Sequence, residues 1–212
     1  QPTIMGGYDA FINKISKDGQ KLWGTYYGGN YSDASGGLDF DNNDNIFVVA
    51  DISIPNPMYP GNTYYYFAQL AILKFKPDGT LVFEKIFGGK SKDISYDLRY
   101  YNNNIYIIGE TYSDDLATPG AFQNSITVGM QAGFVGKFKA SDGSTEWISY
   151  ITGNSHTTVG KIFSANSNGI EIIATTRATD FPMVNAFQPT SHIAPGSTNN
   201  NGLYLNFSES GA

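Results

Sequence analysis

The sequence predicts an all-β fold made of repeated four-stranded antiparallel sheets. Three observations support this prediction: aromatic residues make up 15% of the 212-residue chain, glycine occurs 24 times, and one segment of about 60 residues recurs three times. Aromatic residues favour pleated strands, and glycine favours the tight turns that join them. A repeat of this length indicates that one supersecondary unit is built three times along the chain.

Each repeat opens with an apolar strand that contains a lysine. The lysines Lys14, Lys74 and Lys137 lie 60 and then 63 residues apart. A tight turn follows each strand, because the glycine of an Asp-Gly pair readily takes the positive φ that a hairpin needs. The three strands and turns are residues 10–15 with Asp18-Gly19, residues 70–75 with Asp78-Gly79, and residues 133–138 with Asp142-Gly143.

The second strand carries an aromatic residue at the same position in every copy. This regularity favours core packing over a ligand site. The strand ends at a glycine pair in the first two copies, followed by Asp33 or Asp93, while the third copy has Thr157 at that position. The glycine pairs do not indicate a phosphate-binding loop, because no Lys-Ser/Thr pair and no helix follow them. The three aromatic residues are Trp23, Phe83 and Trp147.

The third strand turns at an asparagine-rich segment into the fourth strand, which is the most apolar of the repeat. Asparagine tolerates the left-handed backbone of such turns. The fourth strand, expected at residues 46–50, 105–109 and 170–174, is bulky on both faces in two copies. Such a strand must be covered on both sides, which sheets stacked around a central axis achieve more naturally than a two-layer sandwich. We therefore expect a β-propeller in which each repeat forms one blade.

We expect residues 1–212 to form one partial propeller domain, which the repeats divide into units. The units are expected at about residues 8–65, 66–129 and 130–199, and residues 200–212 begin the next blade. The prediction is about three blades plus the first strand of a fourth, belonging to a larger ring. Large apolar faces are seldom left in water, so missing blades of the same protein or a partner protein would cover the open blade faces.

Longer connectors separate the repeats, and we expect Phe122 and Phe187 to pin the second and third of them. The first connector departs from the pattern, with three prolines and a run of tyrosines. Exposed tyrosine offers a large contact area at low entropic cost, so these tyrosines are candidates for an interaction site. Ordinary packing within the connector is the alternative and is favoured. The candidates are Tyr59, Tyr64, Tyr65 and Tyr66.

Five markers recur in order: Asp-Ala-Phe at the first strand, Asp-Gly, a Tyr-rich strand into Gly-Gly, an Asn-Ile/Val-Tyr-Ile strand, and Thr-Asp-Phe-Pro leading to Ala-Phe-Gln. With these markers the chain resembles the SBBP, or bacterial β-propeller, repeat family over essentially its whole length. Asp9-Ala10-Phe11 and Phe181-Pro182 match best, whereas Thr152, Thr157 and the first connector depart from the pattern. The resemblance implies a seven-bladed propeller in secreted or cell-surface bacterial proteins, with no defined catalytic activity. The Asn-rich turns and Tyr-rich strands are also similar to those of Bacteroidetes-type exported surface proteins.

Composition argues against several classes of partner. The formal net charge is −6, and charges of both signs are interspersed without a basic stripe, so a nucleic-acid partner is not expected. No apolar run reaches the roughly 18 residues of a membrane-spanning helix, so membrane insertion is not expected. The chain has no cysteine, which excludes disulfides and Cys-based metal sites.

One segment could hold a hard cation. Asp39, Asp41 and Asn43 place oxygen side chains at alternate positions, as short calcium-binding loops do. The bidentate glutamate of such loops is missing, and the other repeats do not keep the acids. Turn chemistry is therefore favoured over calcium, and no other cofactor is expected. The histidines His156 and His192 are each expected in a polar surface loop without catalytic partners.

The leading functional interpretation is a non-catalytic binding or scaffold module of a secreted or cell-surface bacterial protein, mediating protein or glycan interaction. One alternative is a propeller enzyme acting on glycans, with a central-channel site completed by missing blades. In that case Asp33 and Asp93 are the first acids to inspect, although their equivalence favours a structural role. Another alternative is a cargo or subunit of an outer-membrane secretion or surface assembly.

Overall fold

The computed structural model describes residues 2–55, 66–192, 194 and 199–211. Thirteen strands occur in these ranges, and no helix does. Consequently, the described chain contains no helix long and apolar enough to cross a bilayer. The prediction of an all-β fold with four-stranded antiparallel sheets is confirmed.

The strands form three larger sheets and one hairpin, all antiparallel. Sheet 1 contains β3 (Ala34–Phe40), β4 (Ile46–Pro55), β5 (Tyr66–Phe75) and β6 (Leu81–Phe87). Sheet 2 contains β7 (Asp93–Tyr101), β8 (Asn104–Thr111), β9 (Ala132–Lys139) and β10 (Thr145–Ile151). Sheet 3 contains β11 (Thr157–Asn166), β12 (Gly169–Thr176) and β13 (Asn201–Phe207), and the hairpin contains β1 (Ala10–Ile15) and β2 (Lys21–Tyr27).

The sheets do not coincide with the sequence repeats, so the prediction of one sheet per repeat is wrong. Each four-stranded sheet takes the third and fourth strands of one repeat and the first and second strands of the next. β4 pairs with β5 without interruption from Ile46 opposite Phe75 to Pro55 opposite Tyr66, across the expected repeat boundary. A sequence period gives the length of the repeating unit but not the strand at which each sheet begins.

The expectation that the fourth strand is covered on both faces is confirmed in sheet 2. Successive side chains of a strand point to opposite faces, and β8 buries side chains on both of its faces. Ile105 and Ile107 pack in a cluster with residues of sheet 1, whereas Tyr106 and Ile108 pack in a cluster with residues of sheet 3. The apolar character of both faces therefore reflects a sheet that lies between two others.

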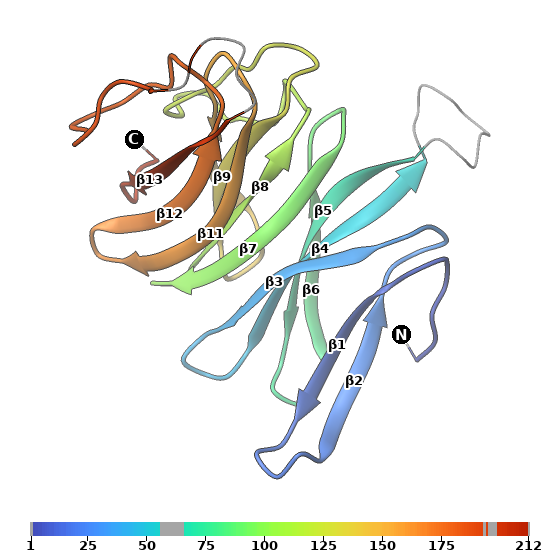
Figure 1. The fold of residues 1–212 in the computed structure, drawn as a ribbon. Coiled ribbons are helices and arrows are strands. Elements are labelled where there is room, and N and C mark those ends of the chain that lie inside the picture. Colours follow the sequence, from blue (N-terminus) through green and yellow to red (C-terminus); the bar gives the residue numbers. More distant parts are fainter. Residues whose placement is uncertain (1, 56–65, 193, 195–198, 212) are drawn as a thin grey trace.

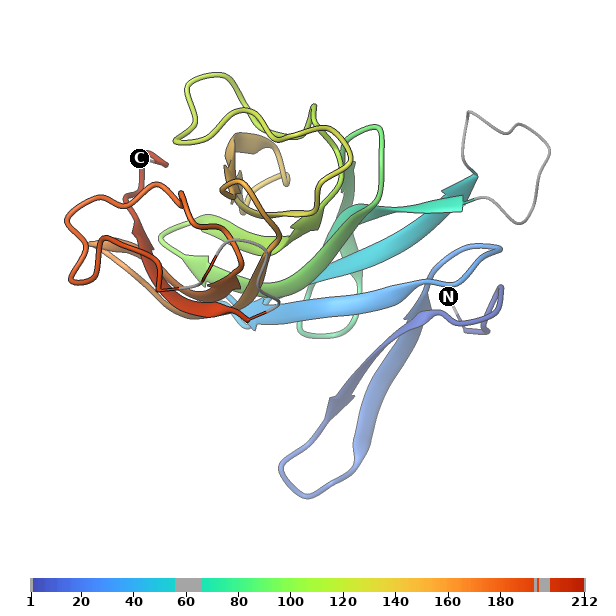
Figure 2. The same cartoon turned by 45° about the horizontal axis from the view of Figure 1, so that its top comes forward.

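Figure 1 shows the sheets stacked face to face, with the two termini at opposite ends of the stack. The edge strands β3 and β7 contact each other, as do β7 and β11. The hairpin extends from the N-terminal end in Figure 2, and it packs on sheet 1 through Ile12 against Val48 and Leu73. None of the described sheets closes on itself.

The connectors are anchored only in part by the residues predicted. Phe187 is fully exposed, which overturns the expectation that it pins the third connector. Phe122 is partly exposed and packs edge-on against Phe207, with 5.8 Å between ring centroids. The buried anchors are Leu116 and Phe181, each of which directly follows an aspartate and joins a core cluster.

Candidate functional site

The recurrent lysines join consecutive sheets. Each donates from Nζ to a backbone carbonyl in the turn of the next repeat. An ammonium that donates to a carbonyl forms a charge-assisted hydrogen bond, which is stronger than a neutral one. The three bonds are Lys14 to Pro77 O at 2.8 Å, Lys74 to Ala140 O at 3.2 Å, and Lys137 to Glu209 O at 3.2 Å.

The recurrent aromatic residues lie at the same junctions. Trp23 Nε1 donates to Pro77 O and Trp147 Nε1 donates to Glu209 O, each at 3.0 Å. Only Trp147 is buried, whereas Trp23 and Phe83 are half-buried, so the prediction of core packing holds fully for Trp147 alone. Their common role is to pack against the turn of the next repeat.

The glycines of these turns fit against the aromatic rings. A Cβ added to Gly79 would lie 2.8 Å from Trp23 Cδ2, and one added to Gly211 would lie 2.6 Å from Trp147 Cδ2. At Gly143 the added atom would lie 3.0 Å from Phe83 Cε2. The glycine of the turn therefore serves sheet stacking as well as chain reversal.

Asp33 and Asp93 hold the crossover from one sheet to the next. The amide of Gly29 donates to Asp33 Oδ2 at 2.6 Å, and that of Gly89 donates to Asp93 Oδ2 at 2.7 Å. The other oxygen of Asp33 accepts from the Ser53 amide at 2.7 Å. Both acids that would be inspected first for an enzyme site therefore use their carboxylates to hold a turn.

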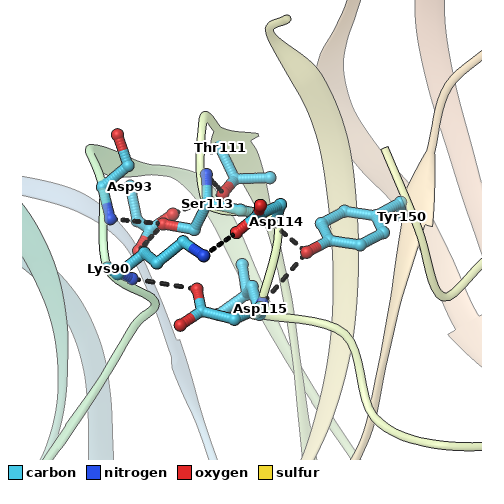
Figure 3. A network of polar contacts seen from close by, with 9 residues as sticks. Lys90, Asp93, Thr111, Ser113, Asp114, Asp115 and Tyr150 are labelled. Carbon is cyan, nitrogen blue, oxygen red and sulfur yellow. Dashed lines mark hydrogen bonds and ion pairs between the residues drawn. The ribbon is translucent and has the colours of Figure 1, made fainter. Parts of the chain in front are cut away.

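A network of polar contacts surrounds Asp93 (Figure 3). Thr111 and Ser113 donate their hydroxyls to the fully buried Asp93 carboxylate, with the Ser113 bond at 3.2 Å. Burial raises the pKa of Asp93, and these hydrogen bonds oppose that effect. In a hydrolytic triad the carboxylate orients a histidine, and this histidine takes the proton of the serine. Here Ser113 donates directly to the Asp93 carboxylate, so the geometry is not that of a triad.

The same network captures the connector that follows β8 (Figure 3). The amide of Lys90 donates to Asp115 Oδ1 at 2.9 Å, and Lys90 Nζ lies 2.7 Å from Asp114 Oδ1. The Tyr150 hydroxyl donates to Ser113 O at 2.6 Å and accepts from the Leu116 amide at 2.9 Å. In the next repeat the amide of Asn154 donates to Asp180 Oδ1 at 2.6 Å, so an aspartate of the connector ties down this crossover turn in both repeats.

The candidate calcium residues point to different neighbours. Asp39 Oδ2 accepts from the Tyr100 amide at 2.8 Å, which ties β3 to β7. Asp41 Oδ1 accepts from the amides of Asn43 and Asn45, each at 2.9 Å. Burial alone would raise the pKa of Asp41, but hydrogen bonds from Asn45 and Asn43 and the charge of Lys74 outweigh it and lower that pKa. Among the residues that the structure describes, no group of three His, Cys, Asp or Glu side chains could hold a metal ion.

The tyrosine candidates are only partly covered by the structure. Tyr59, Tyr64 and Tyr65 lie outside the described residues, and Tyr66 begins β5. β4 and β5 have 10 residues each, so sheet 1 continues as a two-stranded ribbon toward this connector. The histidines His156 and His192 are exposed in loops, as predicted.

The sequence did not predict a groove of about 530 Å³ where three turns of sheets 1 and 2 meet. Its lining comes from the β3–β4 turn, the β7–β8 turn, the ends of β9 and β10 with the turn between them, and from Lys74 and Tyr100. The turn and strand-end residues are Asp41, Asn42, Asn43, Asn45, Asn103, Asn104, Lys139, Ala140, Ser141 and Glu146. These segments are far apart in the sequence, so the pattern of any single turn could not reveal the groove.

No family model matches the chain, and no curated protein matches it significantly.

Proposed function

We propose that this chain is a segment of a β-propeller that acts as a non-catalytic binding and scaffold module in an exported bacterial protein. In this proposal the sheets continue around a central axis beyond both ends of the stack. The turns and connectors at the ends of the sheets then present a surface for protein or glycan partners.

One observation supports the continuation most strongly. Val49, Ile108 and Ile173 are equivalent residues of the fourth strand in the three repeats. Val49 and Ile108 are fully buried against the next sheet, whereas Ile173 is 47% exposed on the outer face of sheet 3. A residue that this fold buries twice is expected to be buried a third time by a sheet of the same construction.

The opposite end of the stack has the complementary pattern. Leu98 and Ile162 are fully buried against the preceding sheet, whereas the equivalent Leu38 is 48% exposed. The hairpin covers part of this face of sheet 1 through Ile12, so the open part lies at Leu38. This open part and the outer face of sheet 3 therefore correspond to the two sides of a junction that occurs inside the chain.

The exported, bacterial setting is supported by the resemblance to the SBBP repeat family. The junction contacts of Lys14, Lys74 and Lys137 support the scaffold role, because they link consecutive sheets by the same bond. Either missing blades or a partner chain could cover the open faces of such a scaffold.

A tandem chain tests the proposal. Joining residues 1–200 to residues 9–212 replaces β13 by the equivalent β1 in the same register, so that β1 and β2 complete sheet 3. We expect one cooperative unfolding transition in urea at a higher midpoint than that of the single chain, and slower hydrogen exchange of the Ile173 amide.

Two results would overturn the proposal. Independent unfolding of the two halves at the midpoint of the single chain would show that the faces are not complementary. Hydrolysis of a glycan or peptide by the tandem chain, abolished by Asp33→Asn or Asp93→Asn without loss of folding, would show that the module is catalytic.

A further inference from the structure

We propose that the groove between sheets 1 and 2 binds a neutral saccharide chain. This inference rests on the proposed role as a binding module and assigns it a site and a class of ligand.

The walls of the groove are held together by bonds between different turns. The Ala140 amide donates to Asn103 O at 3.0 Å, which joins the β9–β10 turn to the β7–β8 turn. Lys74 Nζ donates to Ala140 O at 3.2 Å and lies 3.9 Å from Asp41 Oδ2, which brings in the β3–β4 turn. A site whose walls are already fixed loses little entropy when a ligand binds.

Tyr100 supplies an aromatic surface to the groove. Its ring stacks on Phe47 with centroids 5.5 Å apart and an interplanar angle of 10°, so the ring is braced from one side. Its hydroxyl donates to Asn103 Oδ1 at 3.1 Å, and its amide is held by Asp39. A fixed, half-buried tyrosine that lines a groove can pack against the C–H face of a sugar ring.

The rest of the lining is rich in side-chain amides. Asn42, Asn43 and Asn103 are exposed, and each amide carries both donors and an acceptor. Adjacent hydroxyls of a sugar also donate and accept, so planar amides can bind them in pairs. An aromatic face surrounded by amides is therefore complementary to a polyhydroxylated ring.

The charges of the lining balance. Asp41 and Glu146 are acidic, whereas Lys74 and Lys139 are basic, so the formal charge is zero. A divalent cation is disfavoured because Lys74 lies beside Asp41. An anion is disfavoured by the two carboxylates. The balance favours an uncharged ligand recognised by hydrogen bonds and stacking.

The groove is not required by the repeat. At the equivalent position of the third repeat Ser164 replaces Tyr100, and in the second repeat Tyr101 replaces Asp41. The corresponding junction of sheets 2 and 3 therefore has no aromatic residue at the position of Tyr100 and no acid at the position of Asp41. The first repeat has Phe40 at the position of Tyr100, so the Tyr100 hydroxyl and the Asp41 carboxylate each occur in one repeat only. Groups found in a single repeat are better explained by a local role than by sheet stacking.

The test is a titration of the complete 212-residue chain, labelled with ¹⁵N, with three neutral hexasaccharides: an α-1,4-glucan, a β-1,4-glucan and a β-1,4-mannan. We expect at least one of them to shift the side-chain amide signals of Asn42, Asn43 and Asn103. Signals that shift only outside the groove, or no shift with any of the three, would overturn the inference.

Two variants and a matched control make the assignment specific. Asn103 has φ 59°, so Asn103→Gly removes the amide without straining the turn, and we expect binding about fivefold weaker. Tyr100→Ser introduces the residue of the third repeat and should abolish binding. Asn168→Ala changes an exposed turn asparagine away from the groove and should leave the affinity unchanged. Equal affinities for Asn103→Gly and Asn168→Ala would overturn the inference, and so would tighter binding of a neutral peptide at the same residues.

This outcome is separable from that of the tandem chain. A tandem that unfolds cooperatively while the single chain binds no saccharide would refute only the saccharide site. Saccharide binding by a chain whose tandem unfolds as independent halves would refute only the continuation of the sheets.

Discussion

The turn glycines allow the energy of sheet stacking to be separated from that of the turn itself. Gly19 and Gly143 occupy the same place in the Asp-Gly turn and have similar φ values of 80° and 71°. A Cβ added to Gly19 meets no atom within 4 Å, whereas one added to Gly143 would lie 2.8 Å from Lys85 Cβ and 3.0 Å from Phe83 Cε2. Gly19 has no preceding sheet among the described residues, while Gly143 packs on sheet 1.

The expected effects of alanine follow from this difference. Placing alanine at positive φ costs about 1 kcal/mol at either site. Both substitutions also restrict the unfolded chain equally, and this contribution cancels when they are compared. At Gly143 the overlap with Lys85 and Phe83 adds about 1–3 kcal/mol, the usual cost of overpacking. Gly143→Ala is therefore expected to lose more stability than Gly19→Ala by about that amount.

Urea unfolding of the two variants, followed by tryptophan fluorescence, measures the difference directly. Equal losses in the two variants would refute the reasoning, because they would show that the glycine serves only the turn.

Three further predictions test the interior. Tyr106→Phe should stabilise the protein by about 1 kcal/mol, because the Tyr106 hydroxyl is buried without a partner among the described residues and the first repeat already has Phe47 there. Tyr150→Phe should destabilise the protein by about 1–3 kcal/mol, because it leaves the buried Ser113 carbonyl and the Leu116 amide without a hydrogen-bond partner. Urea midpoints that shift in the same direction for Tyr106→Phe and Tyr150→Phe would contradict these two predictions. Asp93→Asn should remove a pH dependence of stability, because burial raises the folded-state pKa of Asp93. The wild type should therefore gain stability relative to the variant as the pH falls from neutral through that pKa. A constant difference in urea midpoint between pH 7 and pH 4 would contradict this prediction.

Much of the architecture could be predicted because it depends on local chemistry. The Asp-Gly turns, the positive φ of Asn102 and Asn103, and the doubly apolar fourth strand are all local signals. The strand at which each sheet begins could not be predicted. It depends on which strand edges pair, and every strand of the repeat has an apolar face, so the pattern does not distinguish them. The roles of Leu116 and Phe181 were missed because each depends on packing against a core that the connector reaches only in three dimensions.

The site was less predictable than the fold. Repetition correctly indicated a structural role for Asp33 and Asp93, and their bonds to the glycine turns explain why the same residue recurs. The groove around Tyr100 gave no signal, because three unremarkable turns create it only when two sheets stack.

The open apolar faces are the central claim, and the solution mass of the 212-residue chain tests it most directly. Light scattering over a range of concentrations should show self-association that Leu38→Asp or Ile173→Asp weakens. Val128→Asp should not weaken it, because Val128 is 78% exposed but lies in a connector outside both faces. A folded monomer at every concentration, unaffected by any of the three substitutions, would contradict the account, because it would show that the two faces need no further sheet.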